Sequence, residues 1–276
     1  MNITLLILCF SSVFAHRYRD IAPVIRADSI RELSEWVVAY SAQFLHTDHV
    51  KYFGWLLSDK DASVRRATLD GLSAIYIAPF VVALHEFTGR FLPRMIAMLA
   101  DVDTEVRLQA AALLARMQEF GALNEEAVAE ITEYVFDADA KLRGAVAPIV
   151  IDAARPPSKT APLRERIAAV VSFCVDAKQT APRRVACAVD SFWDDIKALQ
   201  DWQGIVDALL EQEQDDEEGE SQGRRRSGRG RRASAAAPSS AASQAASDVQ
   251  QNVLLAILLA SVRKSSGMPL WEDEPY

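Results

Sequence analysis

The sequence has few aromatic residues and few cysteines for its length of 276 residues. Aromatic side chains make up only 8% of the chain, while alanine and leucine are plentiful, and this balance favours helices over sheets. The three cysteines, Cys9, Cys174 and Cys187, are an odd number and lie far apart. They therefore indicate neither a disulfide framework nor a structural zinc site, and they suit a reducing compartment.

Signatures of catalysis and of cofactor binding are also scarce. The sequence has no glycine-rich phosphate loop, and His46 and His49, three positions apart, have no further ligands at a zinc-binding spacing. Carboxylates are abundant, but they fall in predicted turns and on polar helix faces. We therefore expect a protein that is not an enzyme and that needs neither a cofactor nor a metal ion.

Charge is segregated along the chain. The net charge of −8 would argue against a general nucleic-acid binder if it were evenly spread. An acidic run over residues 211–220 is followed, however, by a basic run made of Arg224, Arg225, Arg226, Arg229, Arg231 and Arg232. This run has three interpretations: a contact to DNA phosphates, a nuclear-import signal, or a solvated linker without a specific role.

The N-terminal segment, residues 1–14, is apolar and has two interpretations. Together with Ala15 it matches the apolar region and cleavage site of a secretory signal peptide. No basic residue precedes the apolar run, and no disulfide framework follows it, so we favour the end of a buried helix in a truncated sequence. A later apolar stretch, Val249 to Arg263, has polar ends and is too short for a membrane span. We expect no membrane association.

Three segments share a spacing that is typical of HEAT repeats. Each has an aspartate, an aliphatic residue five positions later and then an arginine: Asp59, Val64 and Arg65; Asp101, Val106 and Arg107; Asp137, Leu142 and Arg143. An aspartate near the turn can cap the next helix, the aliphatic residue packs inward, and the arginine can pair with an aspartate of the neighbouring repeat. The pattern predicts an all-α, HEAT-type helical-repeat solenoid, an ARM-like superhelix.

Composition and periodicity together divide the chain into five segments. Residues 15–100 and 101–210 are predicted to be helical repeats. Residues 211–248 lack a periodic apolar face and are predicted to be a disordered linker. Residues 249–276 are predicted to be a further helix with a C-terminal tail, and residues 1–14 are the apolar segment described above.

Four blocks in the first hundred residues resemble the stromalin conservative domain of the cohesin stromal antigen family. They are His16-Arg17-Tyr18-Arg19-Asp20, Leu33-Ser34-Glu35-Trp36, Lys51-Tyr52-Phe53-Gly54-Trp55 and Phe87-Thr88-Gly89-Arg90-Phe91. The resemblance implies a site as well as a fold. In that family a surface groove beside the kleisin chain receives an aromatic segment of regulators such as shugoshin and an insulator protein. The residues here that match it are Tyr18, Lys51, Trp55 and Arg90, with Phe91 beside them.

These residue types also suit peptide recognition on chemical grounds. Flat rings hold an aromatic anchor, and the two cations can meet acidic neighbours of that anchor. Periodicity alone would instead make Trp55 and Tyr52 core residues of a repeat.

The resemblance implies a regulatory scaffold subunit of cohesin in the nucleus, acting in sister chromatid cohesion. Its expected partners are the kleisin subunit, groove-binding regulators of the shugoshin or insulator-protein type, and chromatin. Two alternatives remain: a cytosolic HEAT-repeat adaptor, or a secreted helical-repeat protein if the N-terminal segment is a signal peptide. Generic HEAT repeats do not require the blocks His16-Arg17-Tyr18-Arg19-Asp20 and Lys51-Tyr52-Phe53-Gly54-Trp55, which favours the cohesin interpretation.

Overall fold

The computed structural model describes residues 3–155, 158, 161–207, 210 and 239–271. These residues contain helices and turns but no strand, as the sequence predicts. In chain order the elements are α1 (Ile3–Cys9), the π-helix η1 (Phe10–Phe14), α2 (Ala15–Arg17), α3 (Pro23–Ala39), α4 (Ser41–Phe44), α5 (Thr47–Leu56), α6 (Ala62–Ile75), α7 (His85–Ala97), η2 (Met98–Ala100), α8 (Thr104–Glu119), α9 (Glu125–Thr132), η3 (Glu133–Phe136), α10 (Ala140–Val150), η4 (Ile151–Ala154), α11 (Leu163–Asp176), α12 (Pro182–Phe192), η5 (Lys197–Gln200) and α14 (Ser239–Ser265).

The chain divides into two compact units. The first comprises Met1–Tyr134 with Gly144–Ile149, and the second comprises Val135–Arg143 with Val150–Tyr276. Among the helices that the structure describes, none is long and apolar enough to span a lipid bilayer.

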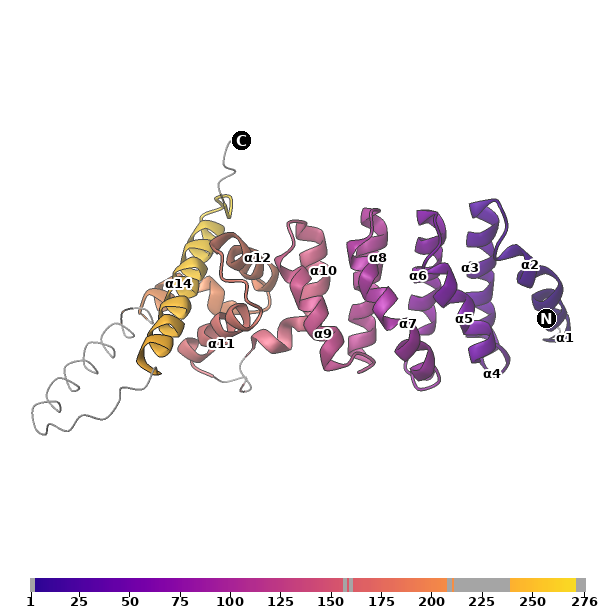
Figure 1. Cartoon of the computed structure of the whole chain (residues 1–276), viewed down its shortest axis with the longest axis horizontal. Helices are drawn as coiled ribbons and strands as arrows, with labels where there is room; N and C mark the ends of the chain where they lie inside the picture. Colours follow the sequence, from indigo (N-terminus) through magenta and orange to yellow (C-terminus); the bar gives the residue numbers. More distant parts are fainter. Residues whose placement is uncertain (1–2, 156–157, 159–160, 208–209, 211–238, 272–276) are drawn as a thin grey trace, which may run out of the picture. The chain divides into compact units, whose positions relative to one another are not determined.

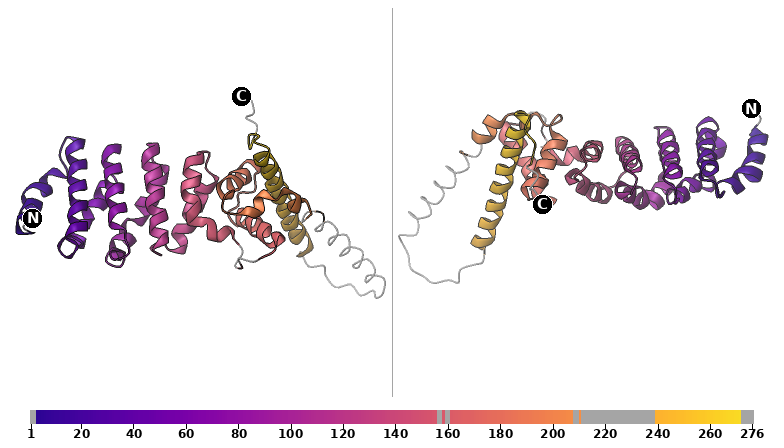
Figure 2. Two further views of the ribbon diagram at one scale, coloured as in Figure 1. Left: turned by 180° about the vertical axis from the view of Figure 1, so that it is seen from behind. Right: turned by 90° about the horizontal axis from the view of Figure 1, so that it is seen from above.

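The first unit is built from two layers of helices. One layer contains α3, α6 and α8, which lie side by side, and the other contains α5, α7 and α9 (Figure 1; Figure 2, right). Each helix buries one apolar face, for example Leu33 and Val37 of α3 and Leu69 and Leu72 of α6. A single repeat cannot cover such a face alone, so stacking neighbouring pairs is what forms the core.

Aspartates start the second helices of the repeats. The side chain of Asp61 accepts a hydrogen bond from the amide of Ser63, that of Asp103 from Val106, and that of Asp139 from Lys141. The cap is therefore the second aspartate of each Asp-x-Asp turn. Each cap satisfies an amide that the helix itself leaves without an acceptor.

The first aspartate of the turn has a different role. In two repeats its carboxylate accepts hydrogen bonds from an arginine of the preceding repeat. Arg26 donates two hydrogen bonds of 2.7 Å to Asp59, and Arg65 donates one of 2.7 Å to Asp101. The same arginines bind the backbone carbonyls of Asp20 and Asp59, six positions earlier in the chain. The predicted contact between repeats is thereby confirmed for Arg65, and Arg26, which lies outside the predicted pattern, makes the same kind of contact. We call these two contacts the arginine ladder.

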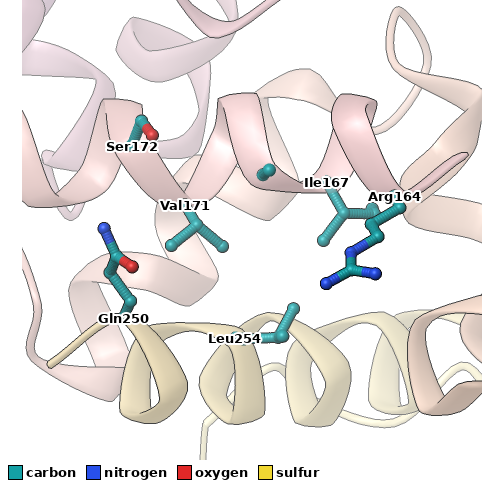
Figure 3. A pocket seen from close by; sticks show the side chains of 7 residues that line it. Arg164, Ile167, Val171, Ser172, Gln250 and Leu254 are labelled. Carbon is teal, nitrogen blue, oxygen red and sulfur yellow. The ribbon is translucent and has the colours of Figure 1, made fainter. Parts of the chain in front are cut away.

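The second unit packs α14 against α11 and α12. Between α11 and α14 lies a cavity of about 140 Å³, with Arg164, Ile167 and Val171 on one wall and Leu254 on the other (Figure 3). On α12, Asp190 accepts hydrogen bonds from Arg143 and from Lys264 of α14. Together these contacts fix the C-terminal half of α14 on the unit.

One predicted boundary is wrong. The sequence predicts a linker up to residue 248 and a helix from Val249, but α14 begins at Ser239. The residues before Val249 are rich in alanine, which has the highest helix propensity. The helix therefore begins ten residues earlier than predicted. Residues 211–238 of the predicted linker lie outside the described residues.

Candidate functional site

Helix α5 positions two of the candidate residues, Lys51 and Trp55. The helix turns its apolar residues Val50, Phe53 and Leu56 into the core. Positions 51, 52 and 55 share the opposite face, since residues three and four apart are neighbours on a helix. Trp55 consequently keeps 44% of its surface exposed, which an indole in the core of a repeat would not.

Tyr18 reaches this face from the turn that follows α2. Its ring centroid lies 4.7 Å from that of Tyr52 and 6.2 Å from that of Trp55, and the Tyr52 and Trp55 rings are 5.1 Å apart. The ammonium of Lys51 lies 5.6 Å from the centre of the Tyr52 ring and 5.7 Å from that of Trp55. Three rings and a cation thus meet from two segments that are distant in sequence.

Arg90 and Phe91 form a second group on α7. The guanidinium carbon of Arg90 lies 5.3 Å from the centre of the Phe91 ring. That ring covers Gly54 of α5 so closely that a Cβ atom there would lie 2.3 Å from it. The two groups therefore adjoin through Gly54, the residue directly before Trp55. We call Tyr18, Lys51, Tyr52, Trp55, Arg90 and Phe91 together the aromatic surface.

The charges on the aromatic surface are positive and accessible. Arg90 is exposed, and Lys51 lies 3.6 Å from the well-exposed carboxylate of Asp48, a separation that leaves its ammonium able to bind other anions. The guanidinium of Arg19 lies 5.6 Å from the centre of the Tyr18 ring. Rings with cations at their edges can hold an aromatic side chain and pair with acidic residues beside it.

Tyr52 was missed as a site residue by sequence reasoning, which left it as a core candidate beside Trp55. The structure places it at the centre of the three rings, half-buried. Two features identify it: Tyr52 lies three positions before Trp55 on the helix, and it is not among the buried residues of α5.

Two cavities among the described residues are lined by other side chains. The arginines from Arg224 to Arg232 fall outside the described residues. In the first unit an open cleft of about 390 Å³ lies between the N-terminal helices and α3, and its walls include Val13, Phe14, Ile25 and Trp36. Neither this cleft nor the cavity beside α14 is lined by a residue of the aromatic surface.

The stacked helix pairs and the arginine ladder define a helical-repeat protein of the HEAT type. Residues 19–92 match the family model described as "Stromalin conservative domain", a range that includes every residue of the aromatic surface except Tyr18, which directly precedes it. The chain thus contains a stromalin conservative domain and is similar in sequence to cohesin SA/Scc3 subunits.

Curated relatives and a solved structure agree with this assignment. Sister-chromatid cohesion protein 3 of Arabidopsis thaliana is 30% identical over 214 residues, which cover 74% of this chain and 20% of that protein. Cohesin subunit SA-3 of Mus musculus is 31% identical over 222 residues, covering 74% and 18%. The structure of cohesin subunit Scc3 from Z. rouxii superposes with a TM-score of 0.62 at 18% identity, covering 97% of this chain and 32% of that one, which supports the fold. The chain spans about a fifth of the length of these curated relatives.

Proposed function

We propose that this chain acts as a non-catalytic scaffold in cohesin, associated with chromosomes in the nucleus, and that its aromatic surface binds a regulator. Its constitutive partner is the kleisin subunit, and the regulators are of the shugoshin or insulator-protein type. The observation that carries the proposal is the exposed cluster of rings and cations on the stretch that matches the stromalin conservative domain.

The ligand chemistry follows from the side chains. The tilted rings of Tyr18 and Trp55 leave a rigid apolar wall for a phenylalanine or tyrosine anchor. Lys51 and Arg90 then pair with acidic residues next to that anchor. Anchors of this kind carry most of the binding energy of an interface, whereas rim contacts mainly exclude water.

The proposal is tested by titrating an acidic peptide that contains one phenylalanine or tyrosine into the wild-type chain and its variants. Trp55→Ala should weaken binding by about 2 kcal/mol or more, the size of an interface hot spot. Arg90→Glu should weaken binding as well, since it places a negative charge beside the acidic ligand. Thermal melts should show a smaller loss for Trp55→Ala than the roughly 3–5 kcal/mol of truncating a buried tryptophan.

Trp202 provides a matched control for the tryptophan variant. Its side chain is 42% exposed, close to the 44% of Trp55, and it lies in the second unit. Trp202→Ala should bind the peptide normally. If Trp55→Ala and Arg90→Glu are both folded and both bind the peptide normally, the aromatic surface is not the regulatory site.

A further inference from the structure

The C-terminal end of α14 turns the chain back onto the second unit. Gly267 has a φ of +68°, a conformation that glycine adopts without strain. The amide of Met268 donates to the carbonyl of Arg263 at 2.9 Å and that of Gly267 to Lys264 at 3.2 Å, the hydrogen bonds of a Schellman-type helix end. Arg263 also donates to the carbonyl of Leu270, at 3.4 Å. The turn thereby delivers the next residue, Trp271, to the unit's surface.

Trp271 lies over two guanidinium groups that come from different helices. The centre of its indole is 5.8 Å from the guanidinium carbon of Arg143, near the start of α10, and 5.3 Å from that of Arg183, near the start of α12. Indole is the best aromatic partner for a cation at such distances. One aromatic side chain of the chain therefore already occupies this pair of arginines, which we call the arginine pair.

Arg143 is fixed in place and its bonding is incomplete. Its side chain is only 2% exposed, and it donates to Asp190 and to the carbonyls of Asp137 and Ala138. Its Nε group is buried and, among the residues that the structure describes, has no hydrogen-bond acceptor. A buried charged donor without an acceptor is costly, and a carboxylate would supply one.

The surroundings of the arginine pair favour negative charge. One carboxylate, that of Asp190, binds both Arg143 and Lys264, so the cations Arg143, Arg183 and Lys264 outnumber it. Arg183 is exposed and stands in the first turn of α12, where the helix dipole is itself positive. Three acidic residues, Glu272, Asp273 and Glu274, follow Trp271 in the sequence. The occupant of the site thus carries an aromatic ring next to carboxylates.

We propose that the arginine pair is a second peptide-binding site, which takes an aromatic residue within an acidic segment of a partner protein, and that Trp271 holds this site in cis until such a segment displaces it. The site lies in the second unit and is made of residues that the aromatic surface does not use. A tail tethered by a few residues competes at an effective concentration of about 1 mM, so it masks the site without tight contacts.

The test uses the full chain and a fluorescein-labelled peptide with the sequence of residues 268–276. Fluorescence anisotropy should show that Trp271→Ala binds this peptide about tenfold more tightly than the wild type. This factor follows because a tail at an effective concentration of about 1 mM, with a dissociation constant of about 0.1 mM, weakens a competing peptide about tenfold. Adding Arg183→Glu to Trp271→Ala should abolish binding. Because Arg183 is exposed, that double variant should melt like Trp271→Ala. A peptide with its tryptophan replaced by alanine should not bind.

Three outcomes would overturn the proposal. Equal affinity for the wild type and Trp271→Ala would mean that Trp271 masks nothing, and no binding to either would mean that there is no receptor site. The third outcome compares two double variants in the Trp271→Ala background. If adding Arg183→Glu leaves peptide binding unchanged while adding Trp55→Ala abolishes it, the peptide binds to the aromatic surface. This last result would leave the function proposed for that surface intact, so the two ideas can fail separately.

Discussion

His49 shows how burial sets the charge of a single side chain. Its ring contacts the rings of Phe10 and Phe44, with centroids 4.5 and 5.1 Å away. Burial lowers the pKa of His49 below its ordinary value, although the neighbouring carboxylate of Asp48 partly opposes this shift. The folded protein therefore keeps His49 neutral at a pH at which the unfolded chain would already bind a proton.

This difference predicts an acid sensitivity at the N-terminal end of the first unit. As the pH falls below about 6.5, the unfolded state takes up a proton that folded His49 resists, so the free energy of unfolding decreases. Melting temperatures measured from pH 8 to pH 5 should fall less steeply for His49→Gln than for the wild type. The exposed His85 is the control, and His85→Gln should follow the wild-type slope. Parallel curves for His49→Gln and the wild type would assign the acid sensitivity to other groups.

At the scale of the element, the arginine ladder predicts a large difference between two aspartates that pair with arginines of α3. The pair of Arg26 with Asp59 is largely buried and joins two repeats, whereas the pair of Arg31 with Asp28 is exposed and lies within the helix. Asp59→Asn keeps an acceptor for the amide of Asp61 but leaves the charge of Arg26 unpaired, and should cost about 3 kcal/mol or more. Asp28→Asn should cost less than about 1 kcal/mol. Denaturant unfolding measures both, and similar small losses would show that the ladder does not hold the repeats together.

Two glycines on neighbouring helices predict opposite effects of the same substitution. A Cβ atom on Gly54 of α5 would lie 2.3–2.4 Å from the ring of Phe91, while one on Gly89 of α7 would meet nothing within 4 Å. Gly54→Ala must push Phe91 aside, so it should cost about 1–3 kcal/mol and weaken peptide binding. Gly89→Ala should stabilise the chain by about 0.5–1 kcal/mol, because alanine is the better helix former. Thermal melts and the peptide titration measure both effects. Unchanged stability and binding in Gly54→Ala would mean that α5 and α7 are not packed through this residue.

The elements also show what the sequence can predict. The spacing of Asp59, Val64 and Arg65 predicts the turn, the helix and the contact with the next repeat. These features depend on residues at fixed positions within each repeat, which the sequence shows directly. The spacing does not separate the aspartate that caps from the one that binds arginine, since both stand in the same turn. The meeting of Tyr18 with Tyr52 and the covering of Gly54 by Phe91 depend on how three helices pack, and periodicity holds no information on that. For the site, only the family resemblance predicts that Tyr18, Lys51, Trp55 and Arg90 act together, because local patterns do not relate residues so far apart in the sequence.

At the scale of the whole molecule, the sequence combines a helical-repeat scaffold with strongly segregated charge. The net charge is −8, and six arginines nevertheless lie within residues 224–232. Among the described repeats, Arg26 and Arg65 are neutralised by Asp59 and Asp101. The arginines of the basic run have no acidic neighbour within the run itself, so the run is the part of the sequence best suited to a polyanion.

If the basic run contacts DNA, its contribution is electrostatic and depends on salt. Each phosphate that an arginine neutralises should add about 0.9 to the slope of log affinity against log salt concentration. Replacing the six arginines from Arg224 to Arg232 with glutamine should therefore weaken binding to duplex DNA and flatten that slope, as measured by anisotropy between 50 and 200 mM salt. Replacing them with lysine keeps the charge and should keep the slope. A nuclear-import signal predicts a different pattern, in which the glutamine variant binds DNA as the wild type does but no longer accumulates in the nucleus. An unchanged salt slope in the glutamine variant would exclude the DNA contact.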